Sequence, residues 1–517
     1  LDSNVSSLFS GDAANTLKQL LGDDEFEKVA AIVKGKAEDS GKSARVRSGT
    51  DVDLTVTDAS GRTLMAIINN DMQFIGSKYA QEMAGRVALA KKGVKSEADF
   101  ERIKEAAVKE ASELGEDTEL IGNSMQSVYN QLLSRPADGQ GVNKGARRFM
   151  DFASVSMLGG MGMAQLAEYG PILAQAGLKD TLQNLHAMNP KNFAKDFKGD
   201  LLTDMESFMG KIGQEEILYS PYVRLEDADD AVTNALLQKY DDVSARAQHL
   251  NGILSGNNAI KRHQQRMAVT LGSSKVIRLA KEGKLDKKFL NEIGIKASTM
   301  NEINKRLRSG DIEFNERGAL DALNLKNWNP EAAENFSVAM NRHMHQVVQR
   351  TLAGEDSYWM AGTFAKMMLQ FRNYPIAAMG KQLARGVRSG NAGPVFLYST
   401  ATAALAYNIK LAVQNKDTSN LTTEDHIQGI MQMSSPAGLL PDMYSTTLTM
   451  MGQDTTFGRQ ADVSNPVFSL VGSAASAPSA MYNLASGEGT KTDVSTVAAV
   501  TPFSNIAGVS ALVNGLK

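Results

Sequence analysis

The chain has 517 residues, of which 42% are hydrophobic and 22% charged, the balance of a globular protein with roughly two to four domains. Its net charge of −3 excludes a nucleic-acid binder that works through overall charge, and the absence of cysteine excludes disulfides and thiolate metal sites. The 25 methionines suit surfaces that repack, although a helical protein with methionine in its core explains them more simply. The chain begins at Leu1 and nothing near it resembles a signal peptide, so we interpret it as part of a longer polypeptide.

Residues 1–75 form the first predicted region, which contains a helix at about residues 13–34 and a β-hairpin. Leu54–Thr57 and Thr63–Met65 alternate in polarity around the glycine-ended loop 58–61. This alternation is the only convincing hairpin signal in the chain.

Residues 76–136 read as a charged helical region. Ser96 is followed three residues later by Asp99, and such a pair accepts hydrogen bonds from the free N–H groups at a helix start. A glycine-rich linker, 137–144, then separates this region from the next one.

Residues 145–190 are predicted to form an apolar helical hairpin. The stretch Phe149–Leu178 is rich in glycine, alanine, serine and methionine, and its only acids are Asp151 and Glu168. Small residues allow helices to approach closely, which matters most where no aqueous hydrophobic effect drives packing. Either a membrane-competent segment or an ordinary buried hairpin fits this pattern. The positions chosen to represent a membrane contact are Phe149, Leu158, Leu166 and Leu178.

Residues 191–356 return to charged helical patterns and are predicted to be a helical middle domain. Asn329, Pro330 and Glu331 mark a clear helix start, because asparagine caps free N–H groups and proline suits the first turn. We expect this helix to run to about Leu352.

Residues 357–416 contain no acidic side chain. After Pro375, apolar residues recur at helical spacing (Ile376, Met379, Leu383 and Val387), and cations fall on the opposite side, so the pattern predicts a basic amphipathic helix. Such a face is often merely solvated, but it also suits lipid headgroups, DNA phosphates or an acidic partner subunit. The basic residues proposed to face lipid or DNA are Lys366, Arg372, Lys381, Arg385 and Arg388.

Pro394–Val413 follows this helix as an apolar segment in which only Lys410 is charged. Its length of about 20 residues is close to what a helix needs to cross a hydrocarbon core. Its representative membrane positions are Phe396, Leu405 and Leu411. Residues 417–517 form a low-charge region of short helices and loops.

Catalytic and metal-binding patterns are weak throughout the chain. His343 and His345 point to different sides of a helix, and the glycines at 159–162 lack the strand and the Gly-Lys-Ser/Thr of a phosphate loop, so we interpret them as helix-packing glycines. Gly429–Met433 resembles a segment of lytic transglycosylases, but the upstream general-acid glutamate and serine are missing, and Glu424 and Asp425 lie too close. We predict a non-enzymatic chain with no cofactor and no metal.

The order of these features resembles the C-terminal portion of the large internal core protein of short-tailed bacteriophages of the autographivirus type. The best match is Phe364–Phe371, within Thr363–Arg372, and the next is the apolar block with Gln165 and Glu168. The segments Asp53–Thr57, with Gly61, and Leu132–Arg135 occur in the same order.

This resemblance implies a virion protein that sits in a core over the portal, leaves before the genome and reassembles in the host envelope as a conduit for DNA. The implied partners are copies of itself and other core proteins in a ring, the portal, phage DNA bound non-specifically and inner-membrane lipids. Family members carry an N-terminal lytic transglycosylase domain that is absent from these residues. We therefore expect a mainly α, elongated, multi-segment protein with one small β-hairpin that assembles into a ring. The alternatives are a helical scaffold with no membrane role and part of a cell-wall hydrolase.

Overall fold

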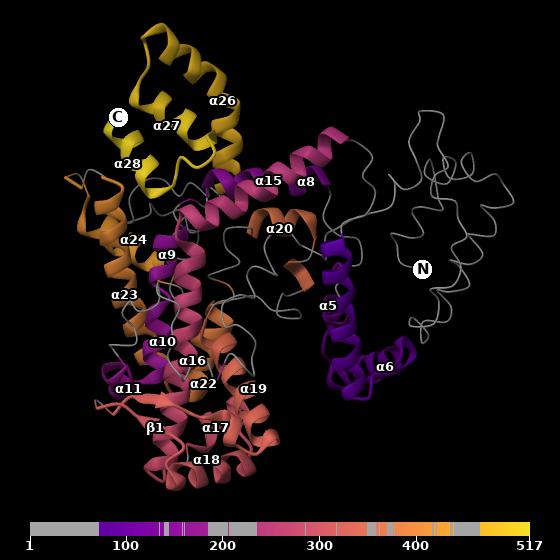
Figure 1. Ribbon diagram of the computed structural model, residues 1–517. Helices are drawn as coiled ribbons and strands as arrows, with labels where there is room; N and C mark the ends of the chain where they lie inside the picture. The colour runs from indigo at the N-terminus through magenta and orange to yellow at the C-terminus, as the bar shows by residue number, and fades with distance from the viewer. Residues whose placement is uncertain are drawn as a thin grey trace, which may run out of the picture. The chain divides into compact units, whose positions relative to one another are not determined.

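The structure is a computed structural model (Figure 1). It describes residues 72–133, 135–138, 144–157, 161–184, 235–284, 286–316, 318–348, 358–360, 362–369, 378–415, 421–434 and 466–516, together with single positions at 159, 205, 376, 418, 419 and 438.

The chain divides into two compact units, each assembled from three separate stretches. Unit 1 contains Leu1–Arg148, Ser220–Val243 and Thr351–Met367, and unit 2 contains Phe149–Tyr219, Ser244–Arg350 and Met368–Lys517. The described residues are mainly helical with one small antiparallel hairpin, which confirms the predicted fold class at that level.

Three helices of unit 1 pack around a small aromatic core. They are α5 (Met72–Lys91), α6 (Glu97–Leu114) and α7 (Thr118–Leu132). The Phe100 ring stacks on the Tyr129 ring with centroids 3.9 Å apart, and Leu133 is buried beside them. The predicted start of α6 is confirmed: the Ser96 hydroxyl accepts from the Asp99 N–H, and the Asp99 carboxylate accepts from the Ser96 N–H.

The main core of unit 2 is built by α16 and the helices that follow it. The elements are α16 (Asn257–Lys281), α17 (Lys287–Ile293), α18 (Ala297–Ser309), the strands β1 (Glu313–Phe314) and β2 (Leu320–Ala322), the 3₁₀ turn η4 (Leu325–Asn327) and α19 (Pro330–Val347). α15 (Ala235–Leu254), which begins in unit 1, precedes α16 in the chain. Phe336, Met340 and Ile303 are fully buried between these elements, and the Trp328 indole donates to the Leu323 carbonyl at 2.8 Å.

The structure describes further helical elements in both units. They are α8 (Lys144–Met157), α9 (Met161–Leu166), α10 (Tyr169–Ala176), α11 (Leu178–Gln183), α20 (Thr363–Leu369), the π-helical turn η6 (Met379–Ala384), α22 (Arg385–Ser389), α23 (Ala392–Val413), α24 (Thr423–Met433), α26 (Pro466–Ser486), α27 (Lys491–Val500) and α28 (Ala507–Leu516). α8 and α20 each begin in unit 1. α26 packs against α27, and α23 lies alongside α9 and α10 (Figure 1).

The observed hairpin is not the one that the sequence indicated. The predicted hairpin at 54–65 and the helix at 13–34 lie outside the described residues. β1 and β2 instead pair around a short loop in which Gly318 has a φ of 76°. The Asn329 cap is confirmed, since its side chain accepts from two N–H groups of α19, but this helix ends at Val347 instead of Leu352.

Candidate functional site

The two apolar segments singled out from the sequence pack directly against each other. Ala167, Ala403 and Ala406 are fully buried between α9, α10 and α23. At Gly170 a Cβ atom would lie 2.5 Å from the Ser399 Cα atom, so only glycine fits there. We call the residues Ala167, Gly170, Ser399, Ala403 and Ala406 the small-residue contact.

The opposite face of α23 remains apolar and exposed. Leu397 is 67% exposed and Leu405 is 64% exposed, and Phe396 and Val413 are also exposed, whereas Leu411 is buried. Large apolar side chains on an unpartnered face mark a surface suited to a partner or to lipid. Among the described residues, however, no helix combines the length and the hydropathy needed to cross a membrane.

A ladder of polar pairs holds the other side of the 149–178 segment to α15 and α16. Each rung joins two residues about 98 positions apart in the sequence, through side chains or a backbone carbonyl. The residue numbers of the two partners increase together along the ladder, so the two stretches run parallel. The rungs are Asp151 with Gln248 at 2.9 Å, Ser154 with Asn251 at 3.3 Å, Gln165 with Gln264 at 2.6 Å, Gln175 with Lys275 at 2.8 Å and Asp180 with Arg278 at 2.9 Å. We call these pairs the polar ladder.

Of the four positions predicted in the first segment, the structure describes the side chains of Phe149 and Leu166. Phe149 and Leu166 are half-buried, and Leu166 packs against the small-residue contact. Leu158 lies outside the described residues, and Leu178 begins α11. Gly159 and Gly162 are closely packed, as predicted, because a Cβ atom at either position would meet backbone atoms within 2.6 Å; that backbone belongs to the turns at residues 505–506 and 255 and not to helices.

The described members of the five predicted basic residues belong to two different units. Lys366 lies on α20 within unit 1, whereas the other described members belong to unit 2. Arg372 lies outside the described residues. Lys381 is half-buried in η6, and Arg388 is exposed on α22.

A π-helical turn explains why Arg385 departs from the predicted face. A π turn closes a wider ring than an α turn, so positions after η6 are rotated relative to those before it. Val387, predicted on the apolar side, is 66% exposed. The Arg385 side chain, predicted to be exposed, is only 11% exposed and forms an ion pair with Glu292. The prediction is therefore wrong for these two residues.

Buried polar groups connect η6 to α10 and α19. The Gln382 amide, 3% exposed, donates to the buried Glu168 carboxylate at 2.9 Å. His343 on α19 is 2% exposed and packs edge-on against the Phe289 ring. Burial, with Arg385 and Lys275 nearby, lowers the pKa of His343 to about 3. Burial also lowers the pKa of Lys275.

This buried histidine predicts a stability that falls below neutral pH. Below its ordinary pKa of 6.5, the unfolded chain takes up a proton that the folded chain refuses, so stability is lost as pH drops from 6.5 towards 3. The slope from this group approaches about 1.4 kcal/mol per pH unit. Urea unfolding at pH 7 and pH 5 measures it. We expect His343→Leu to flatten the pH dependence; a slope unchanged from that of wild type would contradict the assignment.

The segment that resembles lytic transglycosylases is used for packing and capping. Asp425 forms a capping box with Thr422 at the start of α24, and Glu424 is exposed. A Cβ atom at Gly429 would lie 2.3 Å from the Tyr407 ring, so this glycine allows α24 to approach α23. Within the part of the chain that the structure describes, no three metal-ligating side chains come together.

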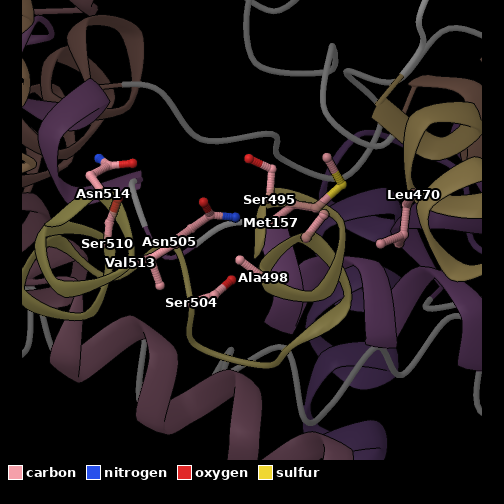
Figure 2. A pocket seen from close by; sticks show the side chains of 10 residues that line it. Met157, Leu470, Ser495, Ala498, Ser504, Asn505, Ser510, Val513 and Asn514 are labelled. Atoms are coloured by element: carbon pink, nitrogen blue, oxygen red, sulfur yellow. The ribbon is translucent and has the colours of Figure 1, made fainter. Parts of the chain in front are cut away.

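A cavity of about 160 Å³ lies among Met157, α26, α27 and the α27–α28 region (Figure 2). Ser504 lines it and is 5% exposed, and its hydroxyl has no hydrogen-bond partner among the described residues. The Asn505 and Asn514 amides donate to the Ser156 and Gln414 carbonyls at 2.8 Å, which makes both of them structural. None of the lining residues carries a charge or an imidazole, so the cavity offers no acid–base pair.

No protein-family model, curated protein or solved structure matches this chain. The candidate site is therefore defined by the structure alone. It consists of the small-residue contact, the exposed face of α23, and Lys381 and Arg388 in η6 and α22.

Proposed function

We propose that this chain is an internal virion protein of a short-tailed phage, ejected into the host envelope to help form the channel for genome DNA. The sequence resemblance motivates this proposal. The observation that carries it furthest is that α23 exposes Leu397 and Leu405 to solvent while its other face is packed through small residues. A segment of this kind can contact lipid without separating from its protein neighbours.

Of the two apolar segments, α23 is the better candidate for lipid contact. The 149–178 segment would have to break the polar ladder, including the pair of Asp180 with Arg278 just beyond it, before it could enter an apolar environment. Separating buried polar partners costs free energy for each group left unsatisfied. By contrast, the exposed face of α23 needs no rearrangement.

The membrane role is tested by flotation of the purified chain with anionic vesicles. We expect wild type to float and Leu405→Asp to float much less, because burying one leucine contributes about 2 kcal/mol to partitioning, and a charge opposes it. Val338→Asp is the matched control, since Val338 is 50% exposed on a different helix, α19.

A wild-type chain that never floats, at low or high salt, would contradict the membrane role and favour the alternative, a helical scaffold. The dense small-residue contact and the ion pair of Arg385 favour that alternative, because both are features of a packed, water-stable interior. In either case we propose a ring with copies of itself and other core proteins, contact with the portal and DNA, and location in the virion core before ejection.

We propose no enzymatic activity for these residues. Glu424→Gln is expected to leave peptidoglycan release unchanged, and a loss of release would revive the hydrolase alternative.

A further inference from the structure

The fold brings exposed cations from two distant parts of the chain to one place. Lys287 and Lys288 stand in the first turn of α17, and Arg388 lies in α22, about one hundred residues further along. The Lys288 ammonium group donates to the backbone carbonyl of Arg388, so the two helices meet at this point. All three side chains are exposed. We call them the basic corner.

These charges are not neutralised within the described part of unit 2. None of the three cations lies within ion-pair distance of a carboxylate in the described residues. Asp286, which directly precedes Lys287, keeps its negative charge while it accepts from the Phe289 N–H, and Glu292 pairs with Arg385, so the three cations leave an excess of positive charge. An excess of like charge raises the local potential and attracts an anionic surface.

Exposed apolar side chains adjoin the basic corner. Val387, 66% exposed, directly precedes Arg388. α22 turns at once into α23, and the two helices approach so closely that a Cβ atom at Gly386 would lie 3.1 Å from the Ala392 Cα atom. The first turns of α23 then expose Phe396 and Leu397. The outer surface of duplex DNA presents phosphates with little apolar surface beside them, because its apolar groups lie within the grooves and the base stack, whereas a lipid interface presents anionic groups and apolar chains together.

We infer that the basic corner is a binding surface for anionic lipid headgroups, with Val387, Phe396 and Leu397 entering the interface beside it. The lysines of α17 are therefore the headgroup contacts, and Arg385 is not one of them. This inference rests on the proposed membrane role and adds the chemistry and the residues of the contact.

The test is binding of the whole chain to phosphatidylcholine vesicles with and without phosphatidylglycerol. Each cation near an anionic surface contributes about 1 kcal/mol, so Lys287→Gln/Lys288→Gln is expected to lower the partition coefficient about tenfold or more at low salt. Arg308→Gln/Lys326→Gln is the matched control. It removes two exposed cations of the same unit, and we expect a change of less than about twofold.

The outcomes separate this inference from the proposed function. Wild type that binds, with the α17 variant unchanged, overturns the basic corner and leaves the membrane role standing. Wild type that binds no vesicle overturns both. A short DNA duplex provides the other arm: if the α17 variant loses duplex binding and keeps vesicle binding, the partner is nucleic acid and the lipid assignment is wrong.

Discussion

Arg278→Met is expected to lower the free energy of unfolding of unit 2 by about 3–5 kcal/mol. The Asp180 carboxylate is 1% exposed and receives both the Nε and the terminal N–H groups of Arg278, at 2.9–3.1 Å. Removing the guanidinium leaves a buried charge without compensation. Chemical denaturation followed by Trp328 fluorescence measures the loss, in a Trp359→Phe background, because the chain has 2 tryptophans.

The controls separate burial from charge. Lys179→Met removes a cation that is 61% exposed and paired with Glu282, and we expect a much smaller effect because solvent screens such a pair. The double variant Asp180→Leu/Arg278→Met removes both partners, and we expect it to recover most of the free energy of unfolding that Arg278→Met loses. If the double variant were as unstable as Arg278→Met, the buried charge would not be the cause.

Gly170→Ala is expected to lower the free energy of unfolding by about 1–3 kcal/mol, because it overpacks a tight contact. The new Cβ atom would lie 2.5 Å from the Ser399 Cα atom and 2.6 Å from its N atom, and backbone cannot move aside as a flexible side chain can. α10 and α23 must therefore separate. The same Trp328 signal measures the change.

Gly472→Ala provides the matched control for this substitution. Gly472 also lies within a helix, α26, and a Cβ atom there meets nothing within 4 Å. Alanine at such a site is expected to be neutral or stabilising by up to about 1 kcal/mol. Equal destabilisation by both substitutions would mean that loss of glycine itself, and not the close approach of α10 to α23, sets the cost.

Short-range signals were predictable from the sequence. The cap at Ser96, the cap at Asn329 and the close-packed glycines at 159 and 162 were all predicted and confirmed, because each depends on neighbours within a few residues or on the absence of a side chain. The apolar character of α23 could also be predicted from the sequence.

Long-range and irregular features were not predictable. The polar ladder joins residues about 98 positions apart, and no periodicity within one segment encodes such pairing. The π turn at η6 breaks the 3.6-residue spacing on which the basic face was predicted, which moved Arg385 inward and Val387 outward. β1 has two residues and β2 has three, too few for alternation to be recognised. The lysines of α17 were overlooked because they lie in an ordinary charged stretch.

The parallel course of the polar ladder has a mechanical consequence. Tension applied between Asp151 and Gln248, at the same end, opens the rungs one after another at low force. Tension between Asp151 and Arg278, at opposite ends, loads every rung in shear simultaneously. The two points between which the chain is pulled therefore decide whether the ladder opens stepwise or resists as a block.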